Sequence, residues 1–161
     1  MKPFYPGLEL SPAQIEDIDR VVDKLTLDEK ASLIAGVDFW HTFPVHDTER
    51  NIDIPSIRLS DGPNGIRGTK FYNSVPSACF PNGTSLGATF NKEILNESGK
   101  LMAIEAKHKG AHVILGPTVN IQRGPNGGRG FESFNEDPTA SGIIASEIIK
   151  GIQSAKVIAT I

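Results

Sequence analysis

The N-terminal part of the chain carries hydrophobic side chains at intervals of three to four residues, the spacing of an amphipathic helix. In residues 11–25 the isoleucines, valines and leucine fall on one face, and Ser11 stands where it can cap the helix. Residues 26–36 continue the pattern, with Thr26 and Glu29 at the spacing of a capping box. We therefore predict two consecutive helices.

Short apolar runs alternate with long amphipathic segments along the rest of the chain. One helix is predicted from Asn91, its N-cap, to the residue before Gly110. Another is predicted with Asp137 as N-cap and Pro138 as first helical residue. Strands are predicted to begin near residues 56, 85, 111 and 156. This alternation is typical of a parallel sheet built from βα units, so we predict an α/β fold.

The last segment, "KVIATI" (156–161), has the apolar, β-branched composition of a buried strand. A parallel strand is normally covered on both faces, and no turn, helix or polar tail follows this one. We expect the chain to be the front portion of a larger protein. The alternative is a natural C-terminal strand at a sheet edge.

The composition argues against several classes of protein. The 161 residues carry a net charge of −3 and no run of lysine and arginine, so a nucleic-acid partner is not expected. No apolar stretch approaches the roughly 20 residues that a membrane helix needs, so no membrane association is expected. The first residues contain no apolar signal core, which predicts a cytoplasmic protein.

Cysteine and histidine do not suggest a metal site. The single cysteine, Cys79, excludes an internal disulfide and a cysteine-rich metal centre, and we expect its thiol to be buried. His108 and His112 are four residues apart, but a glycine ends the predicted helix between them, so they would not share a helical face. His41, beside Trp40, is expected to pack against its neighbours, with a place in the wall of an aromatic pocket as the alternative. We predict no metal and no cofactor.

The stretch "LSDGPNGIRG" (59–68) places Asp61 directly after a predicted strand. Ligand sites in parallel α/β folds form at the carboxyl ends of strands. A carboxylate there can accept hydrogen bonds from two neighbouring sugar hydroxyls. However, Asp-Gly and Pro-Asn-Gly are also turn-forming sequences by themselves. A sugar-binding role and a structural role in a turn are both open for Asp61 on this pattern.

The stretch "GPNGGRGFESFNEDP" (124–138) follows the predicted strand "AHVILGP" in the same way. Its glycines permit backbone conformations with positive φ. Arg123 and Arg129 can present fork-shaped donors to hydroxyls or to a carboxylate. Glu132 can orient either Arg129 or Arg67. These residues are candidates for a ligand-binding loop.

The remaining acids of this stretch have a structural interpretation. Asp137 is expected to cap the following helix, and Glu136 to be a first-turn acid that complements the helix dipole. No P-loop motif is present, and no Gly-x-Gly-x-x-Gly opens a helix directly after a strand. Because the neighbouring acids would also repel an anion, nucleotide binding is not expected.

Six blocks occur along the chain in a fixed order: "LTLDEKASLIAG", "DFWHT", "IPSIRLSDGPNGIRG", "CFPNGTSLGATFN", "VILGPTVNIQRGPNGGRGFESFNEDP" and "KGIQ". Together they resemble family 3 glycoside hydrolases, specifically the yeast and fungal β-glucosidases, from about Leu25 to Ile161. The resemblance implies a TIM-type (β/α)8 barrel, of which three to four βα units would be present. We expect residues 1–25 to form an N-terminal helical segment and residues 26–161 the first part of the barrel domain.

The resemblance implies a role in carbohydrate metabolism, with retaining hydrolysis of terminal β-D-glucosyl residues. The ligand would be a β-glucoside or glucose, without a cofactor. Asp61 matches the residue that holds hydroxyls of the terminal glucose, and Arg129 matches the arginine that clamps the same sugar. Arg67 matches a second arginine near that subsite. Trp40 lies in a matching block but is given no catalytic role.

Three features that the resemblance implies have no counterpart in the chain. These are a Lys-His pair that also binds the terminal sugar, a nucleophilic aspartate in a Ser-Asp-Trp-type segment, and an acid/base glutamate. A retaining glycosidase needs two carboxyl groups about 5 Å apart. We therefore expect the chain alone to be an inactive fragment, with the missing C-terminal part of the same enzyme as its partner. The alternative is a non-catalytic carbohydrate-binding or regulatory protein that keeps Asp61, Arg67 and Arg129.

Overall fold

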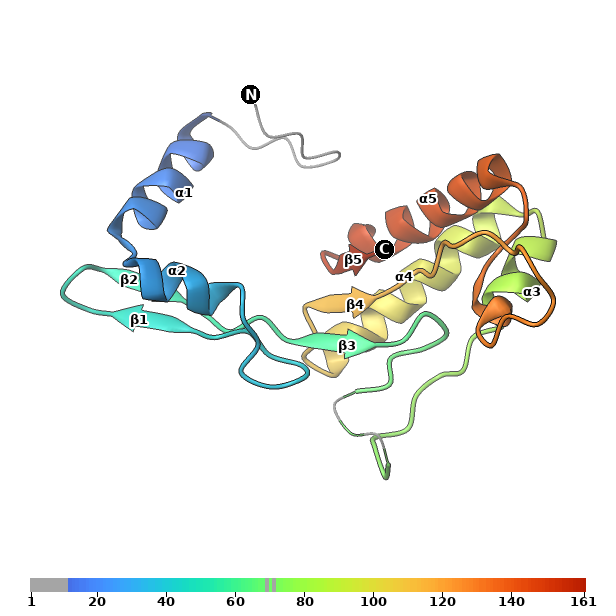
Figure 1. Cartoon of the computed structure of the whole chain (residues 1–161), viewed down its shortest axis with the longest axis horizontal. Coiled ribbons are helices and arrows are strands. Elements are labelled where there is room, and N and C mark those ends of the chain that lie inside the picture. The colour runs from blue at the N-terminus through green and yellow to red at the C-terminus, as the bar shows by residue number, and fades with distance from the viewer. Residues whose placement is uncertain (1–11, 69, 71) are drawn as a thin grey trace. The chain divides into compact units, whose positions relative to one another are not determined.

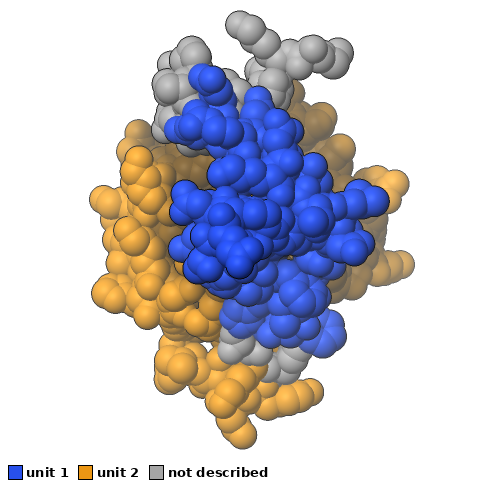
Figure 2. All heavy atoms as spheres, turned by 90° about the vertical axis from the view of Figure 1, so that its left-hand side faces the viewer, with its two compact units in different colours: residues 1–56 blue, residues 57–161 orange. Residues whose placement is uncertain are grey.

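The computed structural model describes residues 12–68, 70 and 72–161, so Ser11, the expected cap of the first helix, lies outside the described residues. The chain divides into two compact units, residues 1–56 and residues 57–161, coloured separately in Figure 2. The domain boundary expected between residues 25 and 26 is a different division and stays a prediction.

The described residues of the first unit form two helices and an antiparallel hairpin (Figure 1). They are α1 (Pro12–Lys24), α2 (Leu27–Leu33), β1 (Val45–Asp47) and β2 (Ile52–Ile54). The predicted capping box is present at the start of α2. The Thr26 hydroxyl accepts from the Glu29 N–H at 3.2 Å, and the Glu29 carboxylate accepts from the Thr26 N–H at 2.8 Å. The hairpin was not predicted, because its short strands are not joined by a glycine-containing turn.

A single arginine links the hairpin region to α2. Arg50 donates to both carboxylate oxygens of Glu29, at 2.5 and 2.9 Å, and its Nε donates to Asp47 at 2.6 Å. The hydrogen bonds from Arg50, followed by the one from the Thr26 backbone, lower the pKa of Glu29 from 4.5 to about 2. Arg50 also lowers the pKa of Asp47 through its backbone and side-chain hydrogen bonds.

This cluster predicts a pH-dependent contribution to stability. Because the folded pKa of Glu29 lies below its unfolded value, the contribution is present above pH 4.5 and is lost as the pH falls from 4.5 towards 2. We expect Arg50→Met to flatten the dependence of melting temperature on pH in this window, as measured by circular dichroism. Arg20→Met, which removes an exposed pair with Asp17, is the control and should leave the slope intact. An unchanged slope in Arg50→Met would contradict the assignment.

The second unit is built on a three-stranded parallel sheet in the order β3-β4-β5, with helices α4 and α5 in its crossovers (Figure 1). Its elements are β3 (Leu59–Asp61), α3 (Gly83–Ala88), α4 (Lys92–His108), β4 (Val113–Leu115), the 3-10 turn η1 (Gly130–Glu132), α5 (Pro138–Ser154) and β5 (Ile158–Thr160). The register pairs Asp61 with Leu115 and Leu115 with Thr160, so the three strands end at one edge.

The two long helices begin and end as predicted. Asn91 and Asp137 cap α4 and α5 by accepting from the N–H groups of Ile94 and Thr139. Gly110 lies just beyond α4 with a φ of 71°. The helices pack on each other and on the sheet through a shared apolar core, which includes Leu95, Met102, Ala103, Ile114, Ile148 and Ile152.

The strand predicted near residue 85 is a helix. Asn82 precedes α3 and its side chain accepts from the Ser85 N–H at 2.8 Å, which starts a helix rather than extending a strand. Leu86 is buried on the inner face of this helix. The described residues therefore contain two βα units and a third strand, instead of three to four units.

The close packing of α4 on α5 depends on glycine at Gly151. A Cβ there would lie 2.1 Å from the Asn96 carbonyl oxygen, in the backbone of the facing helix. We expect Gly151→Ala to lower the free energy of unfolding by about 1–3 kcal/mol, since the helices must separate. Gly142 lies in the same helix with nothing within 4 Å of its would-be Cβ, so Gly142→Ala is the matched control. Thermal melts should show a loss in the first variant and none in the second; equal melts would contradict this packing.

Candidate sugar-binding site

Asp61 is the last residue of β3 and lies at the carboxyl edge of the sheet. The chain turns back at once, because the Arg67 N–H donates to the Asp61 carbonyl at 3.0 Å and Gly68 bridges to Asp61. This return requires glycine at Gly62, whose φ is 144° and whose Cβ would lie 1.6 Å from the Gly65 carbonyl oxygen. The segment is thus a turn that also presents a carboxylate at the strand end.

Arg67 reaches this carboxylate from the far side of the turn. Its Nη1 lies 3.3 Å from Asp61 Oδ2, and both side chains are about two-fifths exposed, at 41% and 40%. The second oxygen, Asp61 Oδ1, accepts no hydrogen bond from a described residue. Asp61 is therefore anchored through one oxygen and can offer the other to a ligand.

The loop that follows β4 carries Arg129, immediately before η1. Its Nε and Nη2 donate to the two carboxylate oxygens of Glu132 at 2.9 and 2.6 Å. The Glu132 side chain is 11% exposed, whereas that of Arg129 is 77% exposed. Of the two partners predicted for Glu132, the structure shows Arg129 and not Arg67. The Nη1 group of Arg129 donates to no described residue.

Electrostatic effects connect the two loops. Hydrogen bonding to Glu132 raises the pKa of Arg129, and the charge of Asp61 raises it further. Hydrogen bonding from Arg129 is also the main cause that lowers the pKa of Glu132. Since Asp61 acts on Arg129 through space, the two groups lie within electrostatic reach of each other. The structure thus brings Asp61, Arg67 and Arg129 to the same edge of the sheet.

A second network, which the sequence analysis missed, holds the loop around η1. Gln122 Nε2 donates to Thr84 Oγ1 at 2.8 Å and to the Ser133 carbonyl at 3.0 Å, and Thr84 Oγ1 donates to the same carbonyl at 3.0 Å. The start of α3 also packs tightly here, because a Cβ on Gly83 would lie 2.1 Å from the Glu132 carbonyl oxygen. Thus α3 supports the turn that carries Arg129 and Glu132.

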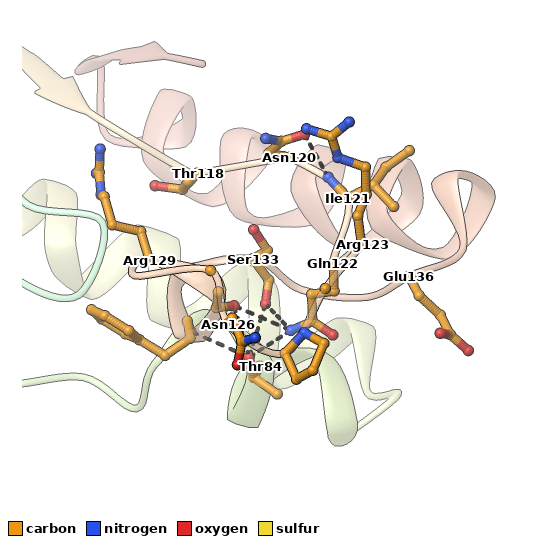
Figure 3. Close-up of a pocket in the computed structure, with 15 residues that line it drawn as sticks. Thr84, Thr118, Asn120, Ile121, Gln122, Arg123, Asn126, Arg129, Ser133 and Glu136 are labelled. Atoms are coloured by element: carbon orange, nitrogen blue, oxygen red, sulfur yellow. Dashed lines mark hydrogen bonds between the residues drawn. The ribbon is translucent and has the colours of Figure 1, made fainter.

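The loop between β4 and α5 encloses an open concavity of about 1010 Å³. Figure 3 shows Arg129 near Thr118 at one end of it, and Glu136 at the opposite end. Arg123 also lines it and has no hydrogen bond or ion pair with a described residue. Glu136 precedes the capping residue Asp137, so the first-turn position expected for Glu136 is wrong.

The structure also places the histidines and the cysteine that the sequence offered as candidates for chemistry. His41 Nδ1 lies 3.0 Å from the Asp38 carboxylate. His108 ends α4 and His112 lies outside it, as predicted, with His112 Nδ1 accepting from the Arg58 N–H at 2.9 Å. Cys79 is exposed, so its expected burial is wrong. The described part of the chain contains no cluster of three or more possible metal ligands and no helix long and apolar enough to cross a membrane.

Comparison with known proteins identifies the family of the chain. The model of the glycosyl hydrolase family 3 N terminal domain matches residues 41–161, which include β3, the turn after it and the loop of Arg129. The chain belongs to glycosyl hydrolase family 3. A putative β-glucosidase from Schizosaccharomyces pombe is 59% identical over 145 residues, which are 90% of this chain and 17% of that protein.

Solved structures of family 3 enzymes share the fold. The β-glucosidase from Kluyveromyces marxianus in complex with glucose matches with a TM-score of 0.83 and 56% identity over 89% of this chain. β-Glucosidase 3B from Thermotoga neapolitana in complex with α-D-glucose matches with a TM-score of 0.79 and 35% identity over 89% of this chain. The sheet and its crossover helices are thus a portion of the family 3 barrel, as predicted. The chain spans about one sixth of the length of the curated relatives it matches, at 16–17% of each.

Proposed function

We propose that the chain carries the glucose-holding part of a retaining β-glucosidase active site, formed by Asp61, Arg67 and Arg129. The proposal rests on the ion pairs at the carboxyl edge of the sheet. Asp61 is anchored by Arg67 and Arg129 by Glu132, yet Asp61 Oδ1 and Arg129 Nη1 have no described partner. The Kluyveromyces marxianus and Thermotoga neapolitana relatives are β-glucosidases whose structures are complexes with glucose and with α-D-glucose.

These groups match the chemistry of a neutral sugar. Two neighbouring hydroxyls of a sugar can donate to the Asp61 carboxylate while one of them also accepts from Arg129, and these hydrogen bonds are charge-assisted. The two carboxylates of Asp61 and Glu132 balance the two guanidinium groups of Arg67 and Arg129. A balanced site favours an uncharged polyol over a phosphate or a carboxylate ligand.

Catalysis requires groups beyond these. A retaining glycosidase needs a nucleophile and an acid/base whose carboxyl groups are about 5 Å apart. Asp61 and Glu132 are both engaged by arginines, which suits holding and support rather than attack on the sugar. We assign the nucleophile and the acid/base to parts of a complete family 3 enzyme outside these residues, with residues 26–161 as the first part of its barrel domain.

A chimera tests the proposal. The matched segment of this chain replaces its counterpart in the Kluyveromyces marxianus β-glucosidase, to which it is 54% identical over 145 residues. We expect the chimera to hydrolyse an aryl β-glucoside within about tenfold of the parent kcat/KM, a difference of about 1.4 kcal/mol in the barrier. A folded chimera that binds glucose without turnover would instead support the non-catalytic carbohydrate-binding alternative. The pairing of the Asp61 and Glu132 carboxylates with arginines is also consistent with that alternative.

A further inference from the structure

We propose that Glu132 is a positioning residue of the sugar site, which fixes the direction of the Arg129 guanidinium without touching the sugar. This inference rests on the sugar-holding role proposed above. The Glu132 carboxylate would hold the exposed side chain of Arg129 in one orientation as a hydrogen-bond donor to the sugar.

The contact between Arg129 and Glu132, called the clamp below, is bidentate. Glu132 receives Nε and Nη2 of Arg129 on its two oxygens, at 2.9 and 2.6 Å, which is a bidentate fork. A bidentate pair fixes the plane of the guanidinium as well as its position. The Nη1 group donates to no residue that the structure describes, and it is the group available to a sugar hydroxyl. Arg129 itself is 77% exposed, so the surrounding chain gives its head group little packing.

Glu132 is held in place independently of Arg129. Its side chain is 11% exposed, and Thr118 Oγ1 donates to its Oε2 at 3.3 Å. Its backbone is part of η1 and lies against Gly83, where there is no space for a Cβ. Glu132 is therefore the fixed member of the pair, and Arg129 the member that is oriented.

The matched control lies four residues along the chain. Glu136 lines the same concavity, is exposed, and has no ion pair or side-chain hydrogen bond with a described residue. Glu136→Gln therefore makes the same chemical change as Glu132→Gln without releasing an arginine. A difference between the two variants reports on the clamp and not on the loss of one negative charge.

The test has two measurements on the 161-residue chain. The first is the ¹⁵N NMR signal of the arginine Nε–H groups, since a hydrogen bond to a carboxylate slows their exchange with water. We expect Glu132→Gln to abolish a protected Arg129 signal, Glu132→Asp to keep part of the protection, and Glu136→Gln to leave it unchanged. The second is the affinity for glucose, which we expect Glu132→Gln to weaken about tenfold and Glu136→Gln to leave within twofold.

A double-mutant cycle separates positioning from a general loss of structure. If Glu132 acts through Arg129, Glu132→Gln should have no further effect on glucose affinity in an Arg129→Met background. Additive losses, or an unprotected Arg129 signal in the wild-type chain, would overturn the inference. If glucose does not bind the wild-type chain although the Arg129 signal is protected, the result contradicts the proposed sugar site. It still supports the orientation of Arg129 by Glu132.

Discussion

Asp61→Ala in the chimera is expected to lower kcat/KM for an aryl β-glucoside by a factor of about 100 to 10,000. The carboxylate is anchored at the strand end by Arg67, and its Oδ1, which accepts from no described residue, is proposed to accept hydrogen bonds from hydroxyls of the terminal glucose. A hydrogen bond to a charged group contributes about 1.5–3 kcal/mol, so two of them correspond to this range. Initial-rate kinetics on the purified variant give the measurement.

Two further variants separate charge from structure in this prediction. Asp61→Asn keeps the shape of the side chain and should still cost most of the effect, because the hydrogen bonds lose their charge. Asp53 lies in β2 of the other unit, with a side chain that is 84% exposed, so Asp53→Ala should stay within about twofold of the chimera. Full activity in a folded Asp61→Ala chimera would remove Asp61 from the sugar site.

The second large effect concerns the hydrolytic activity of the isolated chain. The 161 residues alone should show no β-glucoside hydrolysis above the uncatalysed rate, whereas enzymes of this kind accelerate reactions by at least about 10⁶-fold. The physical reason is that the carboxylates at the sheet edge, Asp61 and Glu132, are each neutralised by an arginine and are proposed to hold or support the sugar.

The measurement is a long incubation with a fluorogenic β-glucoside at high chain concentration, compared with the chimera under the same conditions. The Asp61→Ala chain serves as the control for contaminating glycosidases. Turnover that is present in the wild-type chain and absent from this variant would show that the chain is catalytic and that the assignment of the carboxyl pair is wrong.

The elements that could be predicted from the sequence are those whose ends are marked by local chemistry. Asn91 and Asp137 cap long helices, and Thr26 forms a capping box with Glu29, because each side chain satisfies a nearby backbone N–H. The parallel direction of the three strands could be predicted because apolar runs alternate with these helices along the chain. The position of Asp61 at a strand end followed in turn, since it comes directly after an apolar run.

The errors occur where a local signal was overlooked or where distant contacts decide the structure. The segment that forms α3 belongs to the short run "TSLGATF", for which a strand is predicted, but Asn82 caps it as a helix and Leu86 is buried against the core. The hydrogen bonds between Gln122 and Thr84 join residues 38 positions apart, and no local spacing predicts them. Pairing between the strands of the short hairpin likewise has no strong signal in three-residue strands.

A crystal structure of the chimera with bound glucose would show whether Asp61 and Arg129 hold the sugar. We expect two neighbouring hydroxyls of one glucose within about 2.5–3.2 Å of Asp61 Oδ1 and of Arg129 Nη1, with Glu132 still paired to Arg129. Glucose bound away from the β3 end, for example over Arg123 and Glu136 in the concavity, would contradict it.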